Sequence, residues 1–320
     1  MLNNISNKCP VCEHEGISIR SLEKKTIMNE LEHYFAEKPP EEIEVIDYEI
    51  QQCKNCSLEY AFPLEPGSQS FYQWVTTRAN YYPESRWEWL TVIEQIKNRK
   101  GQNLVSILDV GCGGGNFLEI AQKIPNIHLV GLDTTPESVS QCKERGFEVY
   151  CETIESFHQN YPDEKFDYIV SFHCLEHIDK PKAFVESMLC LLKTEGSLFI
   201  STPYSPMSFE QEWFDIMNHP PHHMTRWNKK AYDELAWQLK CNVQYMMPPP
   251  SSILQRTVNT LKLVNFGRNQ LTISKLKLLQ SLCLNFTQFL GVLVRQSARE
   301  KINGMTIADV VLVELTQSKS

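Results

Sequence analysis

The segment from Leu104 to Phe117 constrains the fold more than any other part of the sequence. Its apolar, β-branched residues end in an acidic residue, after which glycine stands at every second position, at Gly111, Gly113 and Gly115. A helix-compatible stretch, 116–124, follows directly. A strand that turns through glycines into a helix presents backbone N–H groups and a helix N-terminus to a ligand. The segment therefore predicts a site for a nucleotide-type cofactor.

Apolar strand-like runs alternate with helix-like segments downstream of residue 101, which favours an α/β fold with a parallel sheet. One helix has clear end signals, with Thr135 as N-cap, Pro136 at its first position and Gly146 just past its end. The predicted strands are 105–109, 128–133, 148–151, 167–172 and 197–202, followed by a helix at 229–239 and a strand at 242–247. Amphipathic helices are expected within 252–300, before a last strand at 306–315.

Two C-x-x-C pairs stand about forty residues apart near the N-terminus: Cys9 with Cys12, and Cys53 with Cys56. Two such turns can present four thiolates tetrahedrally to Zn²⁺, and a closed four-thiolate site is structural. His14 is surplus to this set. Four unrelated thiols are the alternative, and a redox dithiol would need only one pair. The pattern predicts a zinc-binding module.

Length and composition limit the domain organisation and the class of protein. The 320 residues divide into a zinc module (1–65), a helical aromatic-rich connector (66–100) and an α/β domain (101–320) with a helical insertion at about 250–303. A net charge of −8 gives a nucleic-acid partner little electrostatic support. No apolar run is long enough for a transmembrane helix. Eleven cysteines, several of them in core-like patterns, favour reduced thiols and a cytoplasmic location.

An acidic residue, Asp133, ends the second predicted strand, twenty-four residues after Asp109. A carboxylate at that place can accept hydrogen bonds from the ribose hydroxyls of a nucleoside. The D-x-G-x-G-x-G spacing from Asp109 to Gly115 resembles the first motif of class I S-adenosylmethionine-dependent methyltransferases. It differs from the G-x-G-x-x-G of dinucleotide dehydrogenases.

Further segments resemble the same family in order and spacing. Glu152-Thr153 resembles the segment that lies beside the adenine, and Leu175-Glu176-His177 the segment after the fourth strand. The resemblance implies a seven-stranded, Rossmann-like sheet whose last strand runs antiparallel between two neighbours. It also implies that Asp109, Gly111, Gly113, Gly115, Asp133, Glu152 and the carbonyl of Phe172 or His173 bind S-adenosylmethionine. Glu195 stands where relatives often have glycine, which should affect only the geometry of a turn.

Histidines are the candidates for the acceptor side of the reaction, because a hydroxyl or acidic carbon must lose a proton as it is methylated. His177 lies just beyond the fourth strand, although it could be a helix-start histidine bonded to backbone. A stiff loop, 219–227, carries His222, His223 and Arg226. We expect His222 or His223 to act as general base or to orient the acceptor, and Arg226 to be available for a carboxylate or phosphate. A second metal site and a merely packed loop are the alternatives.

The acceptor is expected to be a small molecule, with a saccharide or nucleotide sugar preferred. A cysteine module before a methyltransferase domain resembles sugar C-methyltransferases, although those carry a further C-terminal domain. The PPHHxTRW loop resembles that of methyltransferases of surface-polysaccharide pathways. The alternatives are an RNA methyltransferase with a zinc module and a non-catalytic methyltransferase-like binding protein. The methylated atom (O, N or C), the oligomeric state and the role of the helical insertion stay open.

Overall fold

The computed structural model describes residues 7–78, 81, 83–100, 103–249, 251–266, 285–299, 301–302 and 305–318. A seven-stranded sheet forms its centre, in the order β10-β13-β8-β7-β4-β5-β6. β13 pairs antiparallel with both β8 and β10, and the pairs among the other neighbours are parallel. The predicted α/β fold with an antiparallel last strand is therefore confirmed. The strands of this sheet are β4 (Val105–Val110), β5 (Ile127–Asp133), β6 (Glu148–Cys151), β7 (Phe166–Phe172), β8 (Leu192–Pro203), β10 (Cys241–Met246) and β13 (Val310–Gln317).

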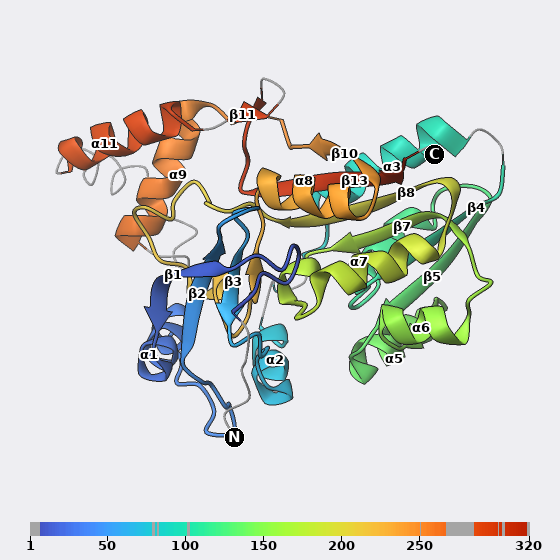
Figure 1. Cartoon of the computed structure of the whole chain (residues 1–320), viewed down its shortest axis with the longest axis horizontal. Helices are drawn as coiled ribbons and strands as arrows, with labels where there is room; N and C mark the ends of the chain where they lie inside the picture. Colours follow the sequence, from blue (N-terminus) through green and yellow to red (C-terminus); the bar gives the residue numbers. More distant parts are fainter. Residues whose placement is uncertain are drawn as a thin grey trace.

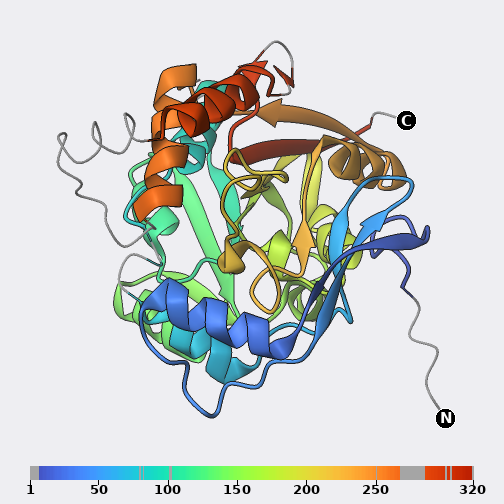
Figure 2. The same ribbon diagram turned by 90° about the vertical axis from the view of Figure 1, so that its left-hand side faces the viewer.

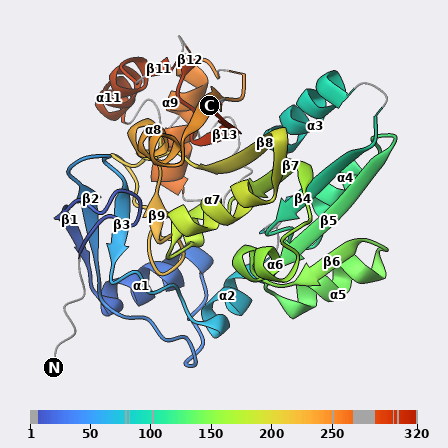
Figure 3. The same ribbon diagram turned by 45° about the vertical axis from the view of Figure 1, so that its right-hand side comes forward.

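Helices cover both faces of this sheet and enclose two apolar cores. One core packs strand residues such as Leu108 and Ile169 against α6, α7 and α8, and Figure 3 shows α7 lying across β7 and β8. The other packs Ile107 and Val170 against α3, α4 and α5. The helices are α3 (Trp87–Lys100), α4 (Asn116–Ala121), α5 (Pro136–Glu144), α6 (Ile154–Asn160), α7 (Pro181–Cys190) and α8 (Lys229–Gln238). The predicted Pro136 start of α5 is confirmed, and Gly146, past its end, has φ +84°.

A second, four-stranded sheet forms at the N-terminal end, in the order β1-β2-β3-β9 (Figure 1). The first three strands come from the cysteine-bearing part of the chain, and β9 comes from the histidine-rich loop that follows β8. Glu59 pairs with Arg226, and Tyr60 with Thr225. The N-terminal sheet, which the sequence analysis does not predict, is thus completed by a strand from far along the sequence. Its elements are β1 (Gly16–Leu22), α1 (Lys24–Phe35), β2 (Tyr48–Cys53), β3 (Glu59–Phe62), α2 (Gln69–Thr76) and β9 (Thr225–Arg226), with short 3₁₀ helices η1 (Leu175–His177) and η2 (Ile216–Asn218) nearby.

Two helices, α9 (Ile253–Phe266) and α11 (Phe286–Ser297), stand before the last strand, as expected of an insertion. Figure 2 shows them at the top of the molecule and α1 at the bottom. The side chain of Gln296 donates to the carbonyl of Ser208 at 2.7 Å, which ties α11 to the loop after β8. Arg256 of α9 in turn donates to the side chain of Gln296. Residues 267–284 of the expected insertion lie outside the described residues.

Two boundaries differ from the sequence prediction. β13 runs from Val310 to Gln317 rather than over 306–315, and a two-residue hairpin of β11 (Lys301–Ile302) and β12 (Met305–Thr306) precedes it. β8 already starts at Leu192, with an irregularity in which Glu195 has φ +68°. Glycine reaches that conformation without strain, which explains why this turn favours glycine. Among the described helices, none is long and apolar enough to cross a bilayer.

Candidate active site

The glycine-rich turn leaves the carboxyl end of β4 in the conformation that its sequence predicts. Gly111, Gly113 and Gly115 have φ values of +79°, +52° and +79°. The backbone N–H groups of Gly111 and Cys112 both donate to the carbonyl of Leu132 in β5. This left-handed region is strained for residues with a Cβ atom, so the turn needs glycine at these positions.

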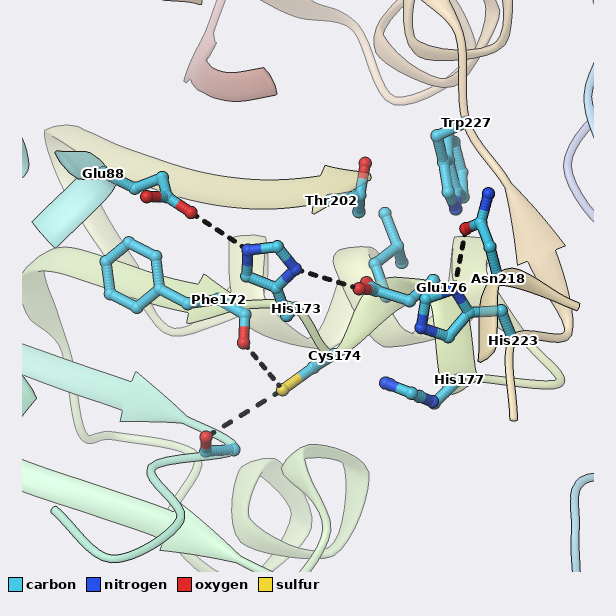
Figure 4. Close-up of polar contacts among 12 residues, drawn as sticks. Glu88, Phe172, His173, Cys174, Glu176, His177, Thr202, Asn218, His223 and Trp227 are labelled. Carbon is cyan, nitrogen blue, oxygen red and sulfur yellow. Dashed lines mark hydrogen bonds and ion pairs between the residues drawn. The ribbon is translucent and has the colours of Figure 1, made fainter. Parts of the chain in front are cut away.

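A second constraint on Gly111 comes from Cys174, which follows β7. A Cβ atom on Gly111 would lie 2.1 Å from the Cys174 Sγ atom. That sulfur lies 3.6 Å from the carbonyl oxygen of Val110 and 3.5 Å from that of Phe172 (Figure 4). The Cys174 side chain therefore fills the space that a Cβ atom on Gly111 would need.

The predicted ribose-binding carboxylate, Asp133, lies at the end of β5 and touches the glycine turn. Its Oδ2 atom accepts from the N–H of Gly113 at 2.8 Å, and its Oδ1 atom from the N–H of Thr135 at 2.8 Å. Asp109 is buried beneath the turn, and burial together with the charge of Asp133 raises its pKa well above the usual value. The structure thus brings Asp109, the glycines and Asp133 to one edge of the sheet, where α/β folds bind ligands.

The other two predicted cofactor residues lie at neighbouring strand ends. Glu152 follows β6, and its Oε2 atom accepts from the Asn160 side chain at 2.9 Å. Phe172 ends β7, and its ring packs against Phe117 and Trp89 with centroids 5.0 and 6.1 Å apart. The predicted aromatic connector therefore reaches, through α3, the edge of the sheet that carries the glycine turn.

A buried charge cluster next to Phe172 is absent from the sequence prediction. His173 has φ +54°, and its ring lies between two carboxylates, with Nε2 2.9 Å from Glu88 and Nδ1 3.3 Å from Glu176 (Figure 4). Glu88 and Glu176 are 2% and 1% exposed. Burial opposes the charge on His173, yet Glu176 and Glu88 raise its pKa above the usual histidine value. Burial likewise opposes ionisation of Glu88, but the hydrogen bond and charge of His173 lower its pKa.

This cluster predicts a pH-dependent loss of stability in Glu88→Ala. We expect a loss of about 2 kcal/mol, because the variant removes one of the two carboxylates that pair with the buried His173 ring, and a hydrogen bond to a charged group contributes about 1.5–3 kcal/mol. The lowered pKa of Glu88 stabilises the fold above about pH 4.5, and this contribution is lost as the pH falls. The raised pKa of His173 stabilises the fold below about pH 6.5, and that contribution is lost as the pH rises through the folded-state pKa.

The difference in the free energy of unfolding between Glu88→Ala and the wild type should therefore be greatest between about pH 4.5 and 6.5. Urea unfolding at a series of pH values measures it. Glu84→Ala, an exposed change on the same segment, is the control. A difference that does not vary with pH would contradict the ion-pair assignment.

Three of the predicted histidines meet in space. His177 follows β7, and its ring centroid lies 4.6 Å from that of His222 and 4.8 Å from that of His223. The rings of His222 and His223 stack at 4.5 Å. Burial lowers the pKa of His177, and lowers the pKa values of His222 and His223 well below the usual value. The loop and the LEH segment, separate in sequence, thus form one histidine cluster of neutral imidazoles.

Two tyrosines, one from α2 and one from the segment before α3, contact this cluster. The Tyr81 hydroxyl lies 3.1 Å from Nε2 of His222. The Tyr72 hydroxyl donates to the backbone carbonyl of His222 at 3.2 Å. Both tyrosines belong to the segment 66–100 that the sequence analysis names as an aromatic-rich connector. The individual tyrosines are not singled out by any sequence motif.

Arg226 is not available for a carboxylate or phosphate of the acceptor, contrary to the sequence expectation. It is 7% exposed, and its Nε atom lies 3.1 Å from Glu59 of β3. Its Nη2 atom pairs with Glu210 and with the hydroxyl of Ser205. The pairing of β9 with β3 brings Glu59 to Arg226. Two half-buried carboxylates already pair with this guanidinium.

The four predicted zinc ligands come together at the start of the N-terminal sheet. The sulfurs of Cys9 and Cys56 lie 3.6 Å apart, those of Cys12 and Cys53 3.3 Å, and those of Cys12 and Cys56 3.7 Å. All four side chains are buried. Zn–S bonds of 2.3 Å in a tetrahedron place sulfurs about 3.8 Å apart, so this spacing fits zinc. The backbone N–H groups of Asn55 and Cys56 also point at the Cys53 sulfur, as in a metal-binding turn.

Curated relatives match the central part of the chain. An O-methyltransferase of ubiquinone biosynthesis from Actinobacillus pleuropneumoniae is 39% identical over 105 residues, which cover 30% of this chain and 44% of the relative. Phosphoethanolamine N-methyltransferase 1 from Arabidopsis thaliana is 28% identical over 150 residues, covering 44% of this chain and 30% of the relative. The chain thus spans less than half the length of these two relatives.

Among solved structures, a SAM-dependent methyltransferase from Archaeoglobus fulgidus is similar with a TM-score of 0.45 and 16% identity, covering 72% of this chain and 94% of that one. The plantazolicin methyltransferase BpumL, in complex with SAH and a substrate analogue, gives a TM-score of 0.48 and 15% identity, with 78% and 90% covered.

A family model matches the part of the chain that forms the candidate site. The sequence model described as "Methyltransferase domain" matches residues 72–245. That range is more than half of the chain and contains the glycine turn, Asp133 and the histidine cluster. The chain therefore belongs to the methyltransferase domain family.

Proposed function

We propose that this protein is an S-adenosylmethionine-dependent methyltransferase whose acceptor is a saccharide, a nucleotide sugar or a related small molecule. One observation carries the proposal: residues 172–177 connect the two halves of the site. At one end, Cys174 packs on the glycine turn. At the other, Nδ1 of His177 donates to the backbone carbonyl of His222 at 2.6 Å. A methyl donor bound on the glycine turn and a methyl acceptor bound at the histidine cluster would then be neighbours.

On the donor side, Asp109 supports the turn from below, and Gly111, Gly113 and Gly115 let the cofactor approach the backbone. Asp133 binds the ribose hydroxyls, which have to share this carboxylate with the N–H of Gly113. Glu152 lies beside the adenine, and the carbonyl of Phe172 accepts from the methionine amino group. S-adenosylmethionine supplies the electrophilic methyl group.

On the acceptor side, His177, His222 and His223 bind and orient the acceptor. Methyl transfer is an in-line displacement, so positioning the acceptor contributes much of the rate. A hydroxyl acceptor also has to lose its proton, and a neutral imidazole can accept it. Burial keeps the pKa values of His222 and His223 well below the usual value, so these rings are neutral near pH 7.

The preference for a sugar rests on the polar character of the acceptor side and on the resemblance of the PPHHMTRW loop. Three imidazoles and two tyrosine hydroxyls offer hydrogen-bond donors and acceptors that suit a polyhydroxylated molecule. The relatives named above are an O-methyltransferase and an N-methyltransferase, so the family's donor side serves different acceptors. The net charge of −8 argues against an RNA acceptor.

The proposal extends to the N-terminal cysteines. Cys9, Cys12, Cys53 and Cys56 would hold a structural zinc ion, which leaves no open position for a reaction. Residues 1–65 would form the zinc module, residues 66–100 the connector, and residues 101–320 the methyltransferase domain of a cytoplasmic enzyme.

Asp133→Ala tests the donor side by calorimetry with S-adenosylmethionine. We expect the affinity to fall about 10- to 100-fold, because hydrogen bonds to a charged group contribute about 1.5–3 kcal/mol. Asp163→Ala, an exposed aspartate remote from the turn in sequence, is the matched control and should bind like the wild type. Equal affinity in Asp133→Ala, or no binding by the wild type, would refute the assignment.

The acceptor is tested by mass spectrometry of products formed from a panel of nucleotide sugars. His222→Ala and His223→Ala should lower turnover strongly without changing the affinity for S-adenosylmethionine. His33→Ala, an exposed histidine of α1, is the control. A protein that binds the cofactor tightly but methylates no member of the panel would instead support the non-catalytic alternative.

A further inference from the structure

The histidine cluster has the arrangement of a metal site as well as that of a catalytic wall. His177, His222 and His223 each offer one ring nitrogen, and no two of these nitrogens are more than 4.8 Å apart. Two of the residues lie in the loop after β8 and one lies 45 residues earlier, so the fold has to bring them together. We propose that these three residues bind a divalent first-row transition-metal ion, separate from the four cysteines.

The hydrogen bonds of the three rings fix the same tautomer in each. Nδ1 of His177 contacts the carbonyl of His222 at 2.6 Å, and Nδ1 of His222 contacts the carbonyl of Met217 at 2.8 Å. A carbonyl oxygen only accepts, so both Nδ1 atoms carry the hydrogen. The Nε2 lone pairs of these two rings are therefore left for a ligand.

The third ring is fixed through an asparagine. Nδ1 of His223 lies 3.0 Å from Oδ1 of Asn218. The Nδ2 atom of Asn218 donates to the Glu210 carboxylate at 2.7 Å, which determines the orientation of the amide. Oδ1 of Asn218 is thus the acceptor, and His223 also keeps its lone pair on Nε2. Metal-binding histidines characteristically donate their second ring nitrogen to a carbonyl or carboxylate in this way.

A buried carboxylate adjoins the cluster in sequence. Glu176, the neighbour of His177, is 1% exposed, and its Oε2 atom has no hydrogen-bond partner among the described residues. Its Oε1 atom contacts His173 at 3.3 Å (Figure 4), so this carboxylate is shared with the His173 imidazole, whose pKa it raises. The Oε2 atom still lowers the cost of placing a cation beside the three imidazoles.

Three imidazoles favour zinc, cobalt, nickel or copper over magnesium and calcium, which prefer oxygen ligands. In a tetrahedral zinc site the nitrogens are about 3.3 Å apart and their lone pairs converge on the ion. The rings of His222 and His223 stack at an interplanar angle of 22°, so these rings have to turn and approach each other when the ion binds. The Tyr81 hydroxyl, 3.1 Å from Nε2 of His222, would give up that contact. Three protein ligands leave a fourth position open for water or for an oxygen of the acceptor, as in catalytic zinc sites.

A role of the ion in methyl transfer rests on the proposed function, whereas the site itself does not. With the ion bound, the histidines would hold the acceptor through the metal rather than take its proton themselves. A metal-bound oxygen is more acidic than a free one, which would aid transfer to a hydroxyl.

The test is cobalt binding by untagged protein from which a mild chelator has removed the more exchangeable metal. We expect the wild type to bind one further equivalent of Co²⁺, with visible bands that lack the intense sulfur-to-cobalt charge transfer of a cysteine site. His177→Ala, His222→Ala and His223→Ala should each weaken this binding at least about 100-fold, and Asn218→Ala about 10- to 100-fold by releasing one ring. His33→Ala should bind like the wild type.

Several results would overturn the site: no sulfur-free equivalent in the wild type, or undiminished binding in all three histidine variants. The number of Co²⁺ equivalents that the wild type binds tests the site even if a variant fails to fold. Calorimetry with S-adenosylmethionine shows which variants are folded. Cobalt binding without any methyl transfer would leave the metal site intact and refute the proposed function. Methyl transfer that continues without the ion would refute only the role of the metal.

Discussion

Replacing Cys53 with serine is expected to remove the proposed zinc ion from the N-terminal sheet and to unfold β1 to β3. Structural zinc contributes roughly 10 kcal/mol or more to small domains that depend on it. This sheet has its own apolar core, with residues such as Ile27 and Phe71. The four cysteines, however, hold the turn before β1 against the turn between β2 and β3, and these three strands are otherwise joined by two antiparallel pairings.

The effect of Cys53→Ser should extend to the acceptor side. The carbonyl of Ser57, next to the second cysteine pair, accepts from Asn228 at 2.7 Å, and Ala61 donates to the carbonyl of Met224 at 2.8 Å. Met224 follows directly after His223. Loss of the zinc should therefore disturb the histidine loop and lower turnover, although no cysteine of the set belongs to the proposed acceptor site.

Metal analysis should show one equivalent of zinc fewer in Cys53→Ser, and hydrogen exchange should show lost protection in residues 48–62. Cys190→Ser, a change at an exposed cysteine, is the matched control. Full zinc content and unchanged exchange in the Cys53 variant would show that the four thiols do not hold the ion.

Gly111→Ala is expected to abolish binding of S-adenosylmethionine. The added Cβ atom would lie 2.1 Å from the Cys174 sulfur, so that side chain would have to move and lose its contacts with the ends of β4 and β7. The residue would also have to keep a φ of +79°, which costs an alanine about 1–2 kcal/mol. Both effects move the N–H groups that the cofactor is proposed to meet.

The two causes can be separated with a double variant. In Gly111→Ala combined with Cys174→Ala, the nearest remaining atom of residue 174 is Cβ, 3.5 Å away, which is an ordinary contact. Binding should then be recovered in part, since only the backbone strain remains. Gly114→Ala is the matched control, because its Cβ atom would meet nothing closer than 3.7 Å. Calorimetry measures all three, and tight binding by Gly111→Ala alone would falsify the placement of the cofactor.

The donor half of the site could be predicted from the sequence because its parts are local. The turn from Asp109 to Gly115 follows from φ values that glycine alone reaches easily. Asp133 lies at the end of an adjacent parallel strand, so strand order alone brings it to the turn. The cysteine pairs could likewise be recognised in the sequence, since the two cysteines of each pair share one tight turn.

The acceptor half depended on contacts between distant segments. Arg226 was predicted to be available, and it is neutralised by Glu59 because β9 pairs with β3 across more than 160 residues of sequence. No motif links Glu88 to His173 and Glu176, since α3 and the end of β7 meet only in the folded chain. Glu88 could have been suspected only as a charged residue in the apolar face of a helix.

The sequence by itself determined the α/β fold, the glycine turn with its acidic partner, and the paired cysteines. These features depend on periodicity, on backbone conformations that one residue type favours, and on spacings within a single turn. Only the tertiary structure decided that β9 completes the N-terminal sheet and that His177 joins His222 and His223. Both result from side chains and strands that are far apart along the chain, and their contact is set by the packing of whole elements.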